Sequence, residues 1–311
     1  MTSPTKPVID HVVILVPHSF LSSPPDWFNE LFKFQSGGRH ADGLTENALV
    51  FLEDGSYLEF IAFVPDVDPA KRESHQWGSK REGTVIDWAV TLPSSAEDTK
   101  EGKEDEETKA SRLEKEFHAV QKQVQDANTG IIYADLKRGG RTRPDNEVLK
   151  WATAFGKRND KSEKESSESD GDGEALEPGT VPFWCLDVTP RHLRVPYLEP
   201  QNTEHPSGVV GVAKMEVFPG LQETVDSARG VYDTLLEQDA AEISASWKVG
   251  TLAGEKVHSN GIVQLNASDG PARIDISFFT NDPGLARTMV GGKVDEESSL
   301  TFRLVAAYEE E

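Results

Sequence analysis

The sequence contains a single cysteine, Cys185, and only three methionines among its 311 residues. One thiol excludes an internal disulfide framework and a thiolate-rich metal site within one chain. No apolar run reaches the length of about 18 residues that a transmembrane helix needs. Residues 1–6 hold no apolar core of the kind found in signal peptides. We therefore expect a cytoplasmic protein.

Positive charge is scarce, because 32 Lys and Arg residues stand against 54 Asp and Glu residues, for a net charge of −22. Phosphate backbones and acidic lipids do not attract such a chain, so we expect neither nucleic acid nor a membrane as a partner. Much of the acidic charge lies in two low-complexity runs, residues 94–107 and 157–178, which we interpret as solvated insertions.

Several catalytic motifs are also missing. The sequence has no phosphate-binding loop, no dinucleotide fingerprint, no His-Glu-x-x-His helix and no Ser-His-Asp order. These absences set aside the enzyme classes that depend on such motifs.

The most informative stretch that is present is a repeated strand. Residues 8–16 are β-branched or apolar almost throughout and predict a buried strand, into which the polar pair Asp10-His11 is set. Residues 85–92 repeat Val-Ile-Asp and place Trp88 where His11 stood, and residues 212–217 give a weaker echo. We infer that the chain is built from units that each begin with this strand.

Each unit has the pattern of a strand, a helix and two or three antiparallel strands. In the first unit, Glu53-Asp54-Gly55 predicts a hairpin between strands at residues 47–52 and 56–63. We predict three units, at residues 1–64, 84–190 (which includes both acidic insertions) and 205–311.

A set of short motifs, in this order, resembles the glyoxalase-like domain family of the vicinal oxygen chelate superfamily. They are Ile9-Asp10-His11, Gly37-Gly38-Arg39-His40, Thr45-Glu46-Asn47-Ala48-Leu49, Gly55-Ser56-Tyr57-Leu58-Glu59-Phe60-Ile61, Pro182-Phe183 and His205-Pro206-Ser207-Gly208. The resemblance covers about Val8 to Val217 without the insertions. It implies an α+β fold of tandem βαβββ modules, as in the glyoxalase, bleomycin resistance and dihydroxybiphenyl dioxygenase proteins, with mixed sheets curled around a cavity and a third βαβββ-like module added.

The resemblance also implies a divalent metal ion in the cavity, held by His and carboxylate side chains. His11 and Glu59 come from the two strands that flank the cavity in such folds, and Glu59 or a bound water would move a proton. Trp88 stands at the place of the second His, and Cys185 or its neighbour stands near that of the second Glu. The third ligand is then either His40 or Cys185, and the ligand set does not distinguish Zn, Fe, Mn and Ni.

These residues also have structural interpretations. His11 can be hydrogen-bonded within the sheet, and His40 can close a turn after two glycines. We expect four residues to contact substrate: Trp88, Arg141, Arg143 and Trp184. The planar forks of the arginines suit a substrate carboxylate, but both can equally lie on the surface of a hairpin, and Trp88 can belong to the core.

Two functions follow from these expectations. The first is a lyase, isomerase or dioxygenase that acts on a small oxygen-bearing metabolite, with a metal ion on His11, Glu59 and His40 and with Glu59 as the catalytic residue. The alternative is a metal-free protein that binds and sequesters a small molecule without catalysis. The third unit could also pair with its copy in a homodimer.

Overall fold

The structure, a computed structural model, describes residues 6–96, 104–143, 145–159, 174–238, 245–253 and 257–308. The first part of the chain forms β1 (Val8–Leu15), α1 (His18–Ser22), α2 (Asp26–Asn29), β2 (Gln35–Arg39), β3 (Thr45–Phe51), β4 (Tyr57–Phe63) and α3 (Pro69–Ser74). The hairpin expected at Glu53-Asp54-Gly55 joins β3 to β4, which pair antiparallel. None of the described helices is long and apolar enough to cross a membrane.

The middle of the chain holds a long helix and several short strands. Its elements are β5 (Thr84–Thr91), α4 (Pro93–Ala96), α5 (Glu106–Asp126), β6 (Ile131–Tyr133), β7 (Lys137–Thr142), β8 (Val148–Ala154), β9 (Gly156–Arg158), β10 (Phe183–Asp187), α6 (Arg191–Arg194) and α7 (Pro200–Thr203). The last part forms β11 (Val209–Phe218), α8 (Gln222–Leu235), β12 (Glu237–Gln238), β13 (Ser246–Val249), β14 (Gly261–Leu265), β15 (Arg273–Thr280), β16 (Met289–Lys293) and β17 (Ser299–Ala306).

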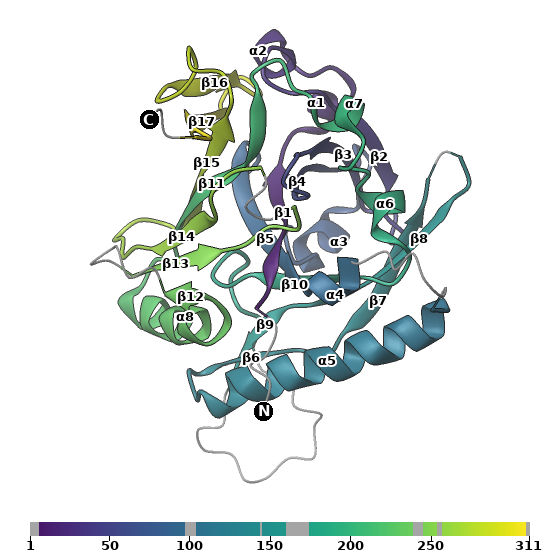
Figure 1. The fold of residues 1–311 in the computed structure, drawn as a ribbon, viewed down its shortest axis with the longest axis vertical. Coiled ribbons are helices and arrows are strands. Elements are labelled where there is room, and N and C mark those ends of the chain that lie inside the picture. Colours follow the sequence, from purple (N-terminus) through teal and green to yellow (C-terminus); the bar gives the residue numbers. More distant parts are fainter. Residues whose placement is uncertain are drawn as a thin grey trace.

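Fifteen of these strands form one mixed sheet, and β6 and β9 form a separate pair. The longest path through the sheet runs β12-β13-β14-β11-β15-β5-β1-β4-β3-β2. In Figure 1, β1 and β5 lie near the middle of the molecule, and α5 and α8 lie below them. The expected α+β class with a large mixed sheet is confirmed.

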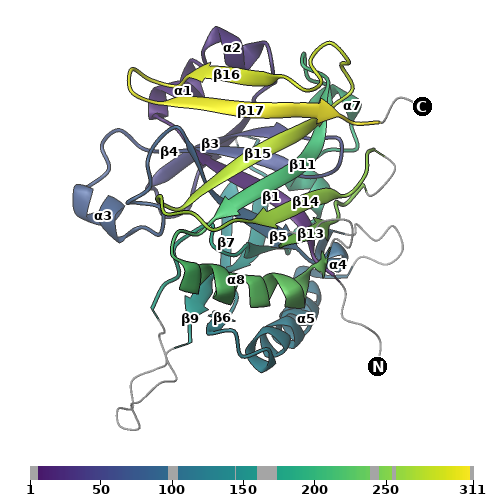
Figure 2. The ribbon, with the colours of Figure 1, turned by 90° about the vertical axis from the view of Figure 1, so that its left-hand side faces the viewer.

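One pattern of strand pairing occurs twice. β1 is parallel to β4 and antiparallel to β5, and β5 is parallel to β10. In the same way β11 is parallel to β14 and antiparallel to β15, and β15 is parallel to β17. Figure 2 shows β17, β15, β11 and β14 as neighbours in this second group. The number of modules and their boundaries remain predictions.

The two faces of the central strands have different neighbours. Val12 and Trp88 belong to the large core that the helices cover, whereas Val13 and Ala89 belong to a smaller apolar cluster on the other face. α5 contributes buried residues at helical spacing to the large core: Ala110, Leu113, Phe117, Val120 and Val124. Its first turn is capped by Asp105, which accepts hydrogen bonds from the backbone N–H groups of Glu107 and Thr108.

Trp88 and Trp184 both lie on the helix side of the sheet. The ring of Trp88 is 6.1 Å from that of Tyr232 in α8, and the ring of Trp184 is 5.6 Å from that of Phe117 in α5. Both side chains are fully buried. Both rings pack the two long helices against the sheet, which for Trp88 is the core role given as its alternative interpretation.

A β-bulge explains why the repeated Val-Ile-Asp motif misplaced Trp88. Between β1 and β5, Ile9 lies opposite Val90 and His11 opposite Ala89, which leaves Asp10 as an extra residue in β1. Further along, β5 carries its own extra residue, Ile86. When the extra residues Asp10 and Ile86 are aligned with each other, His11 corresponds to Asp87 and Val12 corresponds to Trp88.

The ends of both acidic insertions have regular structure, which corrects the expectation of fully solvated runs. Glu106 and Glu107 form the first turn of α5, and residues 93–96 form α4. In the second run, Lys157 belongs to β9 and Leu176 is buried. Residues 97–103 and 160–173, the rest of the low-complexity tracts, lie outside the described residues.

The different positions of two tryptophans give a test of this fold. We expect Trp88→Ala to lower the free energy of unfolding by about 3–5 kcal/mol, because it empties a large site in the core. Trp151→Ala removes a half-buried ring on the other face of the sheet, so its loss should be clearly smaller. Urea denaturation of both variants measures the difference, and equal losses would contradict the assignment of faces.

Candidate functional site

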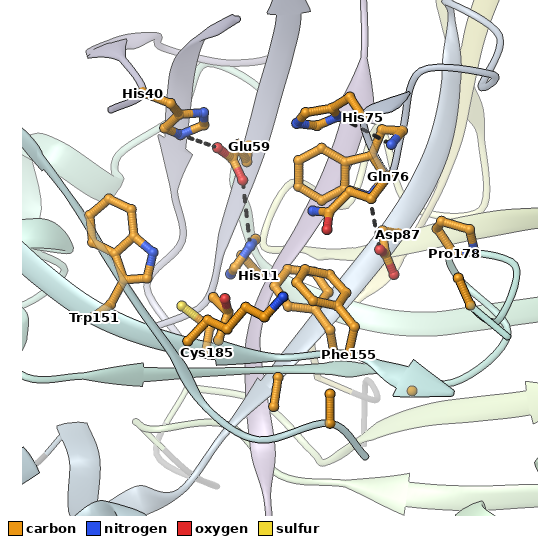
Figure 3. Close-up of a pocket in the computed structure, with 18 of the residues that line it drawn as sticks. His11, His40, Glu59, His75, Gln76, Asp87, Trp151, Phe155, Pro178 and Cys185 are labelled. Carbon is orange, nitrogen blue, oxygen red and sulfur yellow. Dashed lines mark hydrogen bonds and ion pairs between the residues drawn. The ribbon is translucent and has the colours of Figure 1, made fainter. Parts of the chain in front are cut away.

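A pocket of about 730 Å³ lies on the face of the sheet opposite the long helices. Strands β1, β3, β4, β5, β7, β8 and β10 contribute to it. Its lining combines polar groups with an aromatic wall, which consists of Tyr57, Trp77, Trp151, Phe155 and Phe183. Figure 3 shows the labelled side chains of this pocket.

His11, Glu59 and His40 meet at one side of the pocket (Figure 3). The Nε2 atom of His11 lies 3.5 Å from Oε2 of Glu59, and Nε2 of His40 lies 3.4 Å from Oε1. The register explains the meeting of the first two, because the parallel strands β1 and β4 place Val13 beside Glu59, and residues 11 and 13 share a face. The structure thus brings together the three residues predicted as metal ligands.

Asp10, the bulged residue, fixes the orientation of the His11 ring. Nδ1 of His11 lies 2.5 Å from Oδ1 of Asp10, so the ring donates its Nδ1–H to this carboxylate. The ring also stacks on Tyr57, with 4.6 Å between the centroids and 17° between the planes. The Nε2 atom of His11 is therefore turned toward the pocket and Glu59.

The Asp10 carboxylate lies in a buried network of two acids and two bases. Arg191 reaches it at 2.6 Å and Arg194 at 2.9 Å, and both arginines also bind Asp187. Burial opposes ionisation of Asp10, but the charges of Arg194 and Arg191 and the contact with His11 outweigh it and hold the pKa of Asp10 well below its usual value. The carboxylate that orients His11 is thus permanently charged.

Glu59 is also ionised, although it is buried. Burial would raise its pKa, but the hydrogen bond and charge of His40, the charge of His11 and the hydrogen bond from Asn47 together lower the pKa of Glu59 to about 2. The Nδ2 atom of Asn47 donates to Oε1 of Glu59 at 2.6 Å. A carboxylate in this state can bind a cation but is a weak base near neutral pH.

His40 is held by two polar neighbours. Its Nδ1 lies 2.7 Å from the hydroxyl of Thr45, and its Nε2 lies 3.2 Å from Nδ2 of Asn47. A proton on Nε2 of His40 points toward Oε1 of Glu59, 3.4 Å away, and a bound metal ion would take the place of that proton. Gly37 makes this packing feasible, since a Cβ atom there would lie 1.8 Å from Oδ1 of Asn47.

The pocket has one half built on β1 and β4 and another built on β5 and β10, and the two halves carry different side chains. β5 presents Asp87 at the position that corresponds to His11. β10 presents Phe183 beside Ala89, at the position where the pattern of β1 and β4 would place a second Glu. Asp87 accepts hydrogen bonds from the ring of Trp77 and from the backbone N–H of Gly179. Burial is the largest influence and raises the pKa of Asp87 to about 6.

A second group of potential ligands is Asp10, His11 and Cys185, whose ligand atoms lie within 4.8 Å of one another. Its position makes it a poor metal site. The charge of Asp10 is already balanced by two arginines. Burial raises the pKa of the Cys185 thiol well above its usual value, so the thiolate that a metal needs is disfavoured. Both alternatives for a third ligand, His40 and Cys185, thus lie near the His11–Glu59 pair, and the choice between them stays a prediction.

The two arginines expected at the substrate have different surroundings. Arg141 is buried in the lining of the pocket. Arg143 does not line the pocket, and it bonds to the carbonyl oxygen of Leu193 and to the carboxylate of Asp145. These surroundings of Arg143 match its alternative interpretation as a residue outside the pocket.

Sequence reasoning missed the buried network and Asp87. Asp187 ends β10, and Arg191 and Arg194 of α6 follow it by four and seven residues, close enough along the chain for both arginines to bind it. That spacing was a usable signal. Asp87 was visible as an acid in an apolar strand, but the bulge hid its correspondence to His11.

Comparisons with known proteins agree with this geometry. A family model described as "Glyoxalase-like domain" matches residues 9–228, which is more than half of the chain. The chain belongs to the glyoxalase-like domain family. Its fold is related to that of the vicinal oxygen chelate proteins.

A solved structure extends the likeness of this glyoxalase-like protein to nearly its full length. The crystal structure of a hypothetical protein from Staphylococcus aureus matches with a TM-score of 0.59 and covers 96% of this chain and 99% of that chain. At 11% sequence identity the likeness concerns the fold alone. No curated protein matches the sequence.

The buried network predicts a large stability effect. We expect Arg194→Met to lower the free energy of unfolding by about 3–5 kcal/mol, because it leaves Asp10 and Asp187 with one guanidinium between them. The matched replacement Arg138→Met breaks an ion pair with Glu107 that is open to solvent, so it should leave stability almost unchanged. Urea denaturation at neutral pH compares them, and similar losses would argue against the importance of the network.

The low pKa of Glu59 predicts a pH dependence. A pKa that is lowered on folding gives stability that is present above the unfolded value of 4.5 and is lost as the pH falls toward 2. Relative to Glu59→Gln, the wild type should therefore lose about 2 kcal/mol of unfolding free energy between pH 5 and pH 3. Urea titrations at the two pH values measure this difference. Parallel curves for the two proteins would mean that Glu59 is not held as an ion.

Proposed function

We propose that this glyoxalase-like protein is an enzyme that uses a divalent metal ion on His11, His40 and Glu59 to act on a small oxygen-bearing metabolite. One observation carries the proposal: two imidazole Nε2 atoms face the two oxygens of one ionised carboxylate inside a pocket. Each imidazole has its other nitrogen engaged, by Asp10 and by Thr45.

The three side chains suit a metal ion in chemistry and in spacing. Two histidines and one carboxylate form a ligand set found for zinc and for non-haem iron, with positions left open for substrate. Ligand atoms about 2.1 Å from a metal ion lie roughly 3.0–3.4 Å apart at octahedral or tetrahedral angles. The two distances between His and Glu59 atoms, 3.5 and 3.4 Å, are close to this range. The donors do not select among Zn, Fe, Mn and Ni.

The residues around the ligands have distinct tasks in this proposal. A bound ion would act as a Lewis acid on adjacent substrate oxygens. Glu59 stays ionised and serves as a ligand, which is a narrower role than the proton transfer first expected of it. Asp87, in the same pocket and with a pKa of about 6, is better matched to accept and return a proton near neutral pH. Which substrate binds would decide whether the reaction is that of a lyase, an isomerase or a dioxygenase.

A metal-free binding protein is the second candidate, and one observation favours it. Among the described residues, the group whose potential ligand atoms all fall within 4.8 Å of one another is Asp10, His11 and Cys185, so His11, His40 and Glu59 are more widely spaced as a set. The other half of the site adds Asp87 and Phe183 where a second His and Glu would stand. In that case the pocket would hold its ligand through the aromatic wall.

Metal analysis of protein purified without chelators separates the two candidates. We expect about one equivalent of divalent metal in the wild type, because ionised Glu59 and the two Nε2 atoms beside it can bind the ion, with release of any proton from the imidazoles. His11→Ala and Glu59→Gln should lose the metal and remain folded. His18→Ala removes a histidine that pairs with Glu46 away from the pocket, and it should keep the metal. A wild type without metal that still binds apolar ligands would support the second candidate.

A further inference from the structure

Arg141 is a buried cation without a carboxylate partner. Its side chain lines the pocket from β7 and is only 8% exposed. Its Nη1 donates to the carbonyl oxygen of Gly37. Among the residues that the structure describes, no Asp or Glu oxygen lies within 4 Å of its guanidinium, so most of its five N–H donors have no charged acceptor.

The contrast with the other buried arginines shows how unusual this is. Arg191 and Arg194 each bind both Asp10 and Asp187. Burial lowers the pKa of Arg141, whereas the two carboxylates raise the pKa of Arg194 well above its usual value despite burial. Tyr57 and Glu59 act on Arg141 through their charges, but no carboxylate of the described residues contacts its guanidinium, so an anion bound in the pocket would stabilise it.

The neighbours of Arg141 add an aromatic surface. β7 and β8 pair antiparallel with Gly139 opposite Trp151, so Trp151 lies one strand away from Arg141. Further along the lining, the rings of Phe155 and Phe183 stack with 4.8 Å between centroids and 18° between planes. The pocket thus offers a cation, a flat apolar wall and the His11–Glu59 cluster within one volume of about 730 Å³.

We propose that Arg141 is an anion subsite, and that the ligand of this pocket is a small aromatic carboxylate with a further oxygen next to its acid group. The planar fork of Arg141 binds the carboxylate in bidentate fashion. The ring of the ligand lies against Trp151, Phe155 and Phe183, and its oxygen substituent faces His11 and Glu59. The inference rests on the proposed function, since it names the substrate class of the same site.

A pair of matched arginine variants tests the subsite. Arg141→Met removes the charge and keeps the length of the side chain, and Arg141→Lys keeps the charge without the fork. Arg143→Met is the control, because Arg143 lies two residues further along and does not line the pocket. The probes are mandelate and phenylpyruvate, which carry a carboxylate beside a second oxygen, together with mandelamide as the neutral counterpart and lactate as the counterpart without a ring.

Isothermal titration of each protein gives the expected pattern. The wild type and Arg143→Met should bind mandelate or phenylpyruvate at least about tenfold more tightly than mandelamide and lactate. Arg141→Met should lose the preference for the carboxylate over the amide, and Arg141→Lys should be intermediate. A wild type that binds none of the carboxylates better than the amide, or an Arg141→Met variant with unchanged preference, would overturn the subsite.

The metal content of the same samples separates this inference from the proposed function. Arg141→Met should retain the metal of the wild type, because Arg141 is not a ligand. If the carboxylate preference persists in His11→Ala protein that has no metal, the subsite stands even if metal-assisted chemistry fails. If metal is bound but the preference is absent, the subsite fails and the proposed function remains.

Discussion

The site depends on one buried carboxylate, Asp10, held between two guanidinium groups. A charge so deep in the sheet would be prohibitively costly without its partners, and Arg191 and Arg194 supply them from a short helix far along the chain. Arg191 also donates to the carbonyl oxygen of Gly55, and Arg194 to the hydroxyl of Tyr57. The same contacts therefore tie β1, the turn before β4 and α6 into one rigid frame, and His11 is oriented by that frame.

The two halves of the pocket have kept the same backbone with different chemistry. β1 and β5 each carry a bulge, and each is parallel to a second strand that adds a side chain to the pocket. The first half presents His11 and Glu59, which are both polar and mutually close. The second presents Asp87 and Phe183, which cannot bind a metal ion together. A shared backbone thus fixes where side chains point, and the sequence of each half decides what they can do.

The fold class and the first half of the site could be predicted from the sequence, because alternation and motif order carry that information. The family resemblance placed His11 and Glu59 on the two strands that flank the cavity, and the structure has their nearest side-chain atoms 3.5 Å apart. Trp88 was misplaced because a bulge shifts the face of every later residue by one position, and no local pattern marks the bulge. Arg143 and Arg141 are two residues apart, so only the tertiary structure could separate the one on the surface from the one in the pocket.

Charge balance connects these features. The buried network contains two acids and two arginines, so it contributes little net charge to the pocket although it lies beside it. Arg194 of this network also lines the pocket, but Asp10 and Asp187 balance its charge, and Glu59, Asp87 and Arg141 are further buried ionisable groups at separate points of the lining. Glu59 lies beside two imidazoles that can share a cation with it, whereas the hydrogen bond of Arg141 within the described part of the chain goes to a backbone oxygen. A ligand that pairs an anionic group with a neighbouring oxygen satisfies Arg141 and the His11–Glu59 cluster at once, which neither a neutral nor a purely cationic molecule can do.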